Sequence, residues 1–240
     1  EHVRAQESIE VKMPETVTKV SEIPCVDADP KRSCDFVVET EKGGNYTAKA
    51  VIVASGSRRR RLGVPGEDKF EGKGVAFCST CDAPIFSGKR VAVVGGGNAG
   101  LDAVTQEGIR KNPKVQIILN AETQEIIGEQ VVTGLRYKDA KTGEMKELAV
   151  DGVFVEVGAV PNTEIVRGLL ELNQFNEIII DHKTAATSKP GIFAAGDATD
   201  EIYKQNNISA GDAVKAALSV YAYLLGLKKQ SVAAEVPNGK

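Results

Sequence analysis

The sequence predicts an α/β protein in which one domain is inserted into another. Its 240 residues suffice for one large domain or two small ones, and 42% apolar with 26% charged residues is ordinary globular usage. Apolar runs end in glycine at four places, as buried strands of a parallel sheet do where they meet a ligand. These runs are Val51–Gly56, Val91–Gly97, Val153–Gly158 and Ile192–Gly196. Two strand-to-glycine sites flank a central glycine-rich unit, which indicates a nested arrangement.

Short strands are expected up to residue 54. The patterns at 9–11, 17–22 and 34–40 favour strands, and Glu41–Asn45 has the glycines and asparagine of a hairpin turn. Residues 46–54 are expected to pair back and to end in the first apolar run.

The central part begins with residues 62–73, which are rich in glycine, proline and charge and are interpreted as a linker. A strand at 75–77 leads into a cysteine pair, and Val91–Val94 is a buried strand. A helix over 102–111 is expected to end at Asn112-Pro113. Further strands are predicted at 115–119, 122–127, 131–138, 145–150 and 153–157.

The C-terminal part is predicted to hold a helix at 163–172, strands at 178–180 and 192–195, and a long helix at 207–227. The apolar face expected for the long helix consists of Ala213, Ala216, Ala217, Val220 and Leu224. The nested order also predicts that the strands ending at Gly56 and Gly196 share one sheet, while the strand ending at Gly95 lies in another.

Composition excludes several classes of function. The net charge of −3 gives no global field toward nucleic acid or an anionic membrane. No apolar run approaches the ~20 residues that span a bilayer, and the charged N-terminus has no signal-peptide core, so a cytoplasmic protein is expected. Four arginines, Arg58 to Arg61, form either a solvated flank or a contact for phosphate or a partner.

The segment Gly95-x-Gly97-x-x-Gly100 follows the apolar strand 91–94. Its glycines allow a tight turn, approach of the backbone to a pyrophosphate, and close packing of helix on strand. This context favours nucleotide binding over a plain glycine-rich turn. The acidic residue expected ~20 residues later is missing from 115–120, as is a basic cluster, so NADH and NADPH both remain open.

Cys78 and Cys81 have the C-x-x-C spacing, and Asp82 follows them directly. Two thiols at this spacing can close and reopen a disulfide, and Asp82 could transfer a proton to a leaving thiol. A metal site needs further ligands, but the histidines and the other two cysteines are isolated. A redox function of the cysteine pair is therefore favoured over metal binding or over no chemical function. Asp197, after Gly196, either accepts hydrogen bonds from sugar-type hydroxyls or caps the next segment.

The segments Phe77–Asp82 and Gly88–Gly100 resemble the thioredoxin reductase family, which includes the flavoprotein component of alkyl hydroperoxide reductase. Further family motifs follow in order: Ala54-Ser55-Gly56, Val64-Pro65-Gly66-Glu67, Gly158–Thr163, Ala194–Ala198, Tyr203-Lys204-Gln205 and Ser209-Ala210-Gly211. The resemblance covers residues 1–227. It implies two three-layer nucleotide-binding domains: an FAD domain from 1–66 and 160–240, and an inserted NAD(P) domain from 67–159.

The resemblance also implies roles for matching residues. Cys78 and Cys81 would be the redox pair, with Asp82 as proton donor or acceptor. NADPH or NADH would be held by Gly95, Gly97, Asn98, Ala99 and Gly100. Gly196 and Asp197 would hold the ribityl and phosphate end of FAD, and Gly56 would line its other side. Near the flavin ring would lie Lys204, Gln205 and Asn206.

Electrons would pass from NAD(P)H through FAD and the dithiol to a protein disulfide, in a homodimer. The acceptor would be a thioredoxin-like protein or, as an alternative, a peroxiredoxin system. A flavin-free nucleotide-binding scaffold is a further alternative, because the family's first glycine-rich fingerprint has no counterpart in the sequence. Leu101-Asp102 also joins what looks like the start of one family helix to a later helix, which predicts an internal missing segment.

Overall fold

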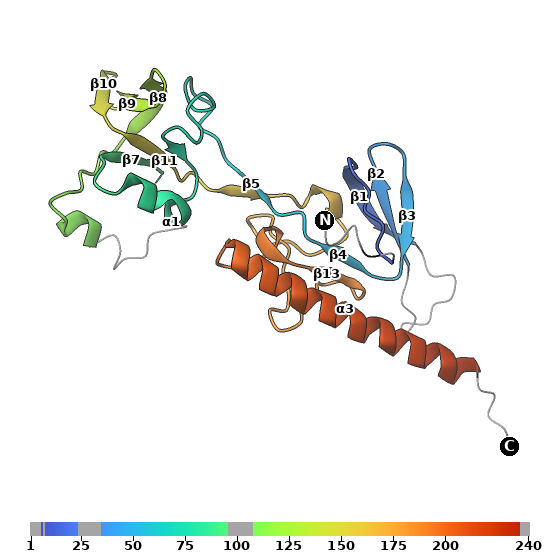
Figure 1. Ribbon diagram of the computed structural model, residues 1–240. Coiled ribbons are helices and arrows are strands. Elements are labelled where there is room, and N and C mark those ends of the chain that lie inside the picture. The colour runs from blue at the N-terminus through green and yellow to red at the C-terminus, as the bar shows by residue number, and fades with distance from the viewer. Residues whose placement is uncertain (1–5, 7, 24–34, 96–107, 236–240) are drawn as a thin grey trace. The chain divides into compact units, whose positions relative to one another are not determined.

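The computed structural model describes residues 6, 8–23, 35–95 and 108–235 (Figure 1). The chain divides into an outer unit, Glu1–Arg58 with Val160–Lys240, and an inserted unit, Arg59–Ala159. Residues 62–73 are not a free linker, because Leu62 and Val64 pack against the core of the inserted unit and Glu67 is buried there. This segment is therefore part of the inserted unit.

The outer unit begins with an antiparallel sheet of three strands: β1 (Val17–Glu22), β2 (Phe36–Thr40) and β3 (Asn45–Ala48). The predicted hairpin turn joins β2 to β3, with Val38 opposite Tyr46. The strand expected at 9–11 is wrong, because Ile9 and Val11 are exposed and belong to no strand.

A parallel pair forms the second sheet of the outer unit. Strand β4 (Val51–Val53) pairs with β13 (Ile192–Ala194), so that Val51 lies opposite Ile192. This confirms that the strands leading to Gly56 and Gly196 share a sheet. A core of ten buried residues packs in this unit: Val20, Phe36, Val53, Val166, Leu170, Ile178, Ile180, Ile192, Ala194 and Ala198.

The helix expected at 163–172 is wrong. Only a short 3-10 turn forms there, η2 (Glu164–Val166), and Gly168 then adopts a φ of +78°, which no right-handed helix contains. The expected strand 178–180 is reduced to bridges from Ile178 to Leu172 and to Thr199. Several residues of this core therefore come from segments that are neither α-helix nor strand.

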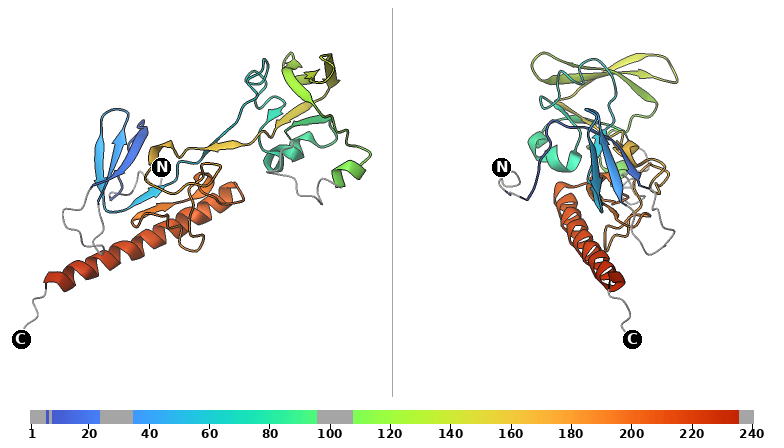
Figure 2. Two further views of the ribbon diagram at one scale, coloured as in Figure 1. Left: turned by 180° about the vertical axis from the view of Figure 1, so that it is seen from behind. Right: turned by 90° about the vertical axis from the view of Figure 1, so that its right-hand side faces the viewer.

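Helix α3 (Asn206–Glu235) packs along β13, β4 and the 3-10 turn η3 (Gly196–Ala198), as Figure 2 shows. The predicted helix is present, but its predicted buried face is only partly right. Ala216 is buried, whereas Ala213, Ala217 and Leu224 are exposed. Within the described residues, no helix has the length and apolar content to cross a membrane.

One side of α3 carries exposed residues without charge, which we name the uncharged flank. Its members are Ala210, Gly211, Ala213, Val214, Ala217, Leu218, Tyr221, Ala222, Leu224 and Leu225. The exposed fractions of Val214, Leu218 and Tyr221 are 61%, 66% and 66%.

The inserted unit contains a parallel sheet with the strand order β6 (Val75–Ala76), β11 (Gly152–Val155), β7 (Val91–Val94). An antiparallel sheet of the same unit is formed by β8 (Ala121–Gly128), β9 (Val132–Asp139) and β10 (Met145–Ala149). Because β7 pairs with β11 and not with β4 or β13, the prediction of a separate sheet is confirmed.

The strand expected at 115–119 does not form. Val115, Ile117 and Leu119 are 43%, 47% and 73% exposed, so the alternating pattern faces solvent instead of a neighbouring strand. A β-strand is defined by backbone hydrogen bonds to an adjacent strand, and no strand within the described residues pairs with residues 115–119. Of the predicted helix 102–111, the described residues 108–111 are helical.

Candidate active site

The inserted unit holds the cysteine pair. Cys78 and Cys81 form a disulfide with their Cα atoms 5.3 Å apart, which confirms the prediction that they lie within disulfide reach. Cys78 directly precedes the one-turn helix α1 (Ser79–Asp82), and the backbone N–H of Cys81 donates a hydrogen bond to the Cys78 sulfur at 3.2 Å. Negative charge on the Cys78 sulfur would therefore be stabilised after reduction.

Aromatic contacts fix the segment on both sides of the pair. The Arg61 guanidinium lies over the ring of Phe77, 4.4 Å from its centroid, immediately before Cys78. On the other side, the Phe86 ring makes an edge contact with Phe154 and occupies the space where any side chain at Gly152 would lie. The disulfide thus sits between two anchored positions.

The 3-10 turn η1 (Ala83–Phe86) follows the pair and presents apolar residues to solvent. Ile85 is 67% exposed, and Pro84 and Cys81 are exposed beside it in the sequence. Asp82 is half-buried at the start of η1, and its side chain makes no capping hydrogen bond. Its carboxylate is therefore not committed to the cap and can serve in proton transfer.

Gly95 follows β7 directly and has a φ of +113°. A Cβ atom at this position would lie 2.2 Å from the carbonyl oxygen of Glu156, so only glycine fits. Gly95 therefore brings the end of β7 close to the end of β11, as the first glycine of a nucleotide-binding turn should. The other predicted nicotinamide contacts, Gly97, Asn98, Ala99 and Gly100, lie outside the described residues.

In the outer unit, Asn162 holds the turn that follows β4. Its side-chain Nδ2 donates to the Ser55 carbonyl at 2.9 Å, and its backbone N–H donates to the Gly56 carbonyl at 2.9 Å. The Ser55 hydroxyl donates to the Asn162 carbonyl at 2.6 Å. Gly56 has a φ of +66°, with open space where a Cβ would be.

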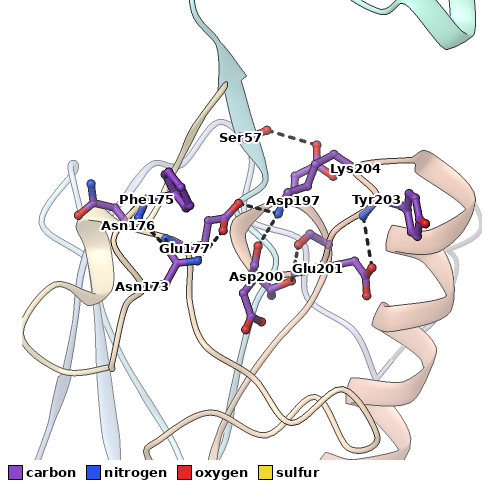
Figure 3. Close-up of polar contacts among 12 residues, drawn as sticks. Ser57, Asn173, Phe175, Asn176, Glu177, Asp197, Asp200, Glu201, Tyr203 and Lys204 are labelled. Atoms are coloured by element: carbon purple, nitrogen blue, oxygen red, sulfur yellow. Dashed lines mark hydrogen bonds and ion pairs between the residues drawn. The ribbon is translucent and has the colours of Figure 1, made fainter. Parts of the chain in front are cut away.

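Asp197 lies at the end of β13, in η3. Its carboxylate accepts a hydrogen bond from the Ser57 hydroxyl at 3.2 Å (Figure 3). It accepts another from the Ser209 hydroxyl at 3.3 Å. Gly196 has a φ of +73°, and a Cβ there would lie 3.1 Å from Ser209. Asp197 thus connects the ends of both parallel strands with the first turn of α3.

Lys204 is held inside the outer unit. Its ammonium pairs with Glu177 at 3.0 Å and donates to the Thr199 carbonyl, and Asn173 donates to the same Glu177 carboxylate (Figure 3). Both side chains of the ion pair are about four-fifths buried. Gln205 and Asn206 are exposed at the start of α3. Lys204 therefore braces the segment that leads to these two residues.

The boundary between the two units falls within the arginine run, and Arg58 and Arg61 each make side-chain contacts within their own unit. Arg58, in β5 (Ser57–Arg59), donates to Asn162 at 2.7 Å and to Glu164 at 2.6 Å. The hydrogen bond from Arg58 holds the pKa of the Glu164 carboxyl below its ordinary value. Arg61 pairs with Asp68 and Glu71 in the inserted unit. Two of the four arginines thus have structural partners.

Several residues of the outer unit were not found from the sequence: Ser57, Asn162, Glu177 and Ser209. Their roles depend on contacts between distant segments, such as the 107 positions between Ser55 and Asn162. The available signals were the two family motifs that contain Asn162 and Ser209.

A disulfide at C-x-x-C spacing, with Cys81 exposed, in an α/β chain is typical of the class of dithiol/disulfide oxidoreductases. The family model of the pyridine nucleotide-disulphide oxidoreductases matches residues 1–106 and 102–217. The chain belongs to this family.

Named relatives support the same family. The chain is 44% identical over 214 residues to "NADH dehydrogenase" of Bacillus subtilis (strain 168), covering 79% of this chain and 42% of that protein. It is 41% identical over 216 residues to the F component of alkyl hydroperoxide reductase of Escherichia coli (strain K12), covering 80% and 41%. The chain thus spans about two fifths of the length of these curated relatives.

Among solved structures, the thioredoxin reductase from Streptococcus pyogenes MGAS5005 matches with a TM-score of 0.75 and 31% identity, covering 88% of this chain and 73% of that one. The thioredoxin reductase from Giardia duodenalis matches with a TM-score of 0.76 and 29% identity, covering 88% and 74%. The chain therefore has the thioredoxin reductase fold.

Proposed function

We propose that the protein is a flavin-dependent reductase that passes electrons from NAD(P)H through FAD and the Cys78–Cys81 dithiol to a protein disulfide. The observation that carries the proposal is the disulfide itself, placed on an exposed turn beside exposed apolar residues. In this proposal the outer unit binds FAD and the inserted unit binds the nicotinamide cofactor.

The outer unit fits a flavin nucleotide at the carboxyl ends of β4 and β13. Gly56 leaves open space beside the backbone, and Asp197 offers carboxylate oxygens to hydroxyl groups. The first N–H groups of α3 lack acceptors within the helix and favour an anionic group. Gly56, Gly196 and Asp197 would hold FAD, with Lys204 bracing the segment that carries Gln205 and Asn206. When bound, FAD supplies a two-electron relay between a nicotinamide and a disulfide.

The cysteines carry the exchange step. Two electrons and two protons convert the Cys78–Cys81 disulfide into two thiols. After one thiol loses its proton, its sulfur attacks the partner's disulfide, so that a mixed disulfide forms and the partner's S–S bond breaks. The second cysteine then attacks the mixed disulfide, which restores Cys78–Cys81 and releases the partner as a dithiol. Asp82 would supply the proton that the leaving sulfur needs.

The partner is proposed to be a thioredoxin-like protein or a member of a peroxiredoxin system. Relatives named as the F component of alkyl hydroperoxide reductase favour the second, and the thioredoxin reductase structures favour the first. A cytoplasmic homodimer is part of the same proposal.

Flavin binding and reduction test the proposal directly. Purified protein is mixed with FAD, freed of unbound cofactor, and reduced anaerobically with NADH and NADPH in turn in a stopped-flow instrument. We expect a yellow protein whose flavin absorbance bleaches and whose disulfide then becomes two titratable thiols. A colourless protein would favour the flavin-free scaffold, and bleaching without new thiols would remove the role of the cysteine pair.

Ile85 is predicted to contact the protein substrate. Replacing Ile85 by glutamate places a charge on the apolar surface beside the disulfide, so the KM for a protein disulfide should rise about tenfold or more. Reduction of a small aromatic disulfide should not change. Val131→Glu is the matched control, because Val131 is also more than half exposed but lies in the β8–β9 turn. Equal effects of the two variants on the protein substrate would contradict the prediction.

A further inference from the structure

Asn162 makes four hydrogen bonds to the turn after β4 and to the residues that follow it. Its side chain and backbone bind the carbonyls of Ser55 and Gly56, and its own carbonyl accepts the Ser55 hydroxyl. Its Oδ1 accepts a further hydrogen bond from Arg58, at 2.7 Å. All four contacts join this one residue to the distant segment Ser55–Arg58.

These contacts fix the direction of the peptide groups in the turn. The carbonyls of Ser55 and Gly56 both point toward Asn162. Across a planar peptide the N–H of the next residue points away from the carbonyl, so the N–H groups of Gly56 and Ser57 point away from Asn162. Successive backbone N–H groups in such a turn favour anions. Asn162 therefore decides which side of the turn a ligand meets.

The same turn is tied to the second parallel strand. Ser57, next to Gly56, donates its hydroxyl to Asp197 at the end of β13. The Arg58 guanidinium bridges Asn162 and Glu164, which secures the chain on the far side of Ser57. Both strand ends that would meet the flavin thus depend on the position of the Ser55–Arg58 segment.

We propose that Asn162 is a positioning residue for the flavin nucleotide: it orients the Ser55–Ser57 turn and thereby sets the affinity of the outer unit for FAD. The inference rests on the proposed function. Asn162 itself touches no reacting atom. Its amide is specifically required, because it donates to one carbonyl while it accepts from one guanidinium.

The test compares FAD affinity with stability in the ligand-free protein. Asn162→Ala removes the side-chain bonds, and Asn162→Asp keeps the contact to Arg58 while it sets a carboxylate against the Ser55 carbonyl. Ser55→Ala removes only the hydroxyl bond and serves as a milder variant. Thr187→Val is the matched control, because Thr187 also donates to a backbone carbonyl of the outer unit, that of Ile192, at 2.8 Å.

FAD affinity is measured by quenching of flavin fluorescence, and stability by thermal unfolding without FAD. We expect both Asn162 variants to bind FAD about 10- to 100-fold more weakly and Ser55→Ala to show a smaller loss. Thr187→Val should unfold earlier but bind FAD within about twofold of the wild type. The reaction of Cys78–Cys81 with dithiothreitol should be the same in every variant.

The outcomes separate the inference from the proposed function. If the wild type binds FAD and both Asn162 variants bind it equally well, the inference is wrong and the proposed function stands. If affinity falls in Thr187→Val as much as in Asn162→Asp, the effect is one of stability and the inference is again wrong. If the wild type binds no FAD at all, both fail.

Discussion

Serine in place of Cys78 or Cys81 is expected to abolish NAD(P)H-driven disulfide reduction, with a loss of at least about a thousandfold. Each cysteine is needed once to form the mixed disulfide or to resolve it, and a hydroxyl can do neither. Reduction of a one-electron dye should continue, because such an acceptor takes electrons from the flavin without a dithiol. The measurement is NADPH and NADH oxidation with each acceptor.

The double variant Cys25→Ser/Cys34→Ser is the control for the loss of a thiol as such. Its two cysteines have no C-x-x-C partner in the sequence, so disulfide reduction should persist. Retained turnover in Cys78→Ser, or a trapped mixed disulfide that involves neither Cys78 nor Cys81, would contradict the proposed chemistry.

Gly95→Ala is expected to destabilise the inserted unit by roughly 2–5 kcal/mol and to remove nicotinamide binding. The positive φ of 113° contributes about 1–2 kcal/mol for any residue with a Cβ. The methyl group would also lie 2.2 Å from a backbone oxygen of Glu156, and relief of such overpacking costs about 1–3 kcal/mol. Urea unfolding and quenching of NADH fluorescence measure the two effects.

Gly88→Ala isolates the contribution of backbone conformation. Gly88 has a φ of +76°, and no atom lies within 4 Å of the place a Cβ would take, so its replacement should cost only about 1–2 kcal/mol. Binding of NADH or NADPH should survive in Gly88→Ala. Equal stability losses in the two variants would show that the approach of β7 to β11 is not a tight constraint.

The sequence was most informative where the chemistry is local. The short strand at 17–22, the hairpin turn at 41–45 and the cysteine spacing all depend on near neighbours, and each appears in the structure. The helix expected at 163–172 failed because apolar spacing there reflects burial of irregular backbone rather than helical periodicity. The roles of Asn162 and of Glu177 beside Lys204 depend on contacts that no local pattern encodes.

The junction of Leu101 with Asp102 lies outside the described residues, and a missing segment there stays a prediction. The family model matches the chain in two stretches that overlap at residues 102–106, next to the junction. A crystal structure would decide it: consecutive Cα atoms 3.8 Å apart within a regular helix would contradict the prediction. A longer gap would support it, and the segment between would then contain the residues that distinguish NADH from NADPH.

The uncharged flank of α3 should increase the retention of the protein on a hydrophobic chromatography matrix. The side chains along this flank, from Ala210 to Leu225, are apolar or small and are exposed to solvent. Ammonium sulfate strengthens the association of such surfaces because it is excluded from them. The protein should therefore bind a phenyl-substituted matrix at moderate salt and elute as the salt is lowered. Leu218→Lys would shift this elution to higher salt, which makes retention time a simple gauge of how much of α3 is accessible in solution.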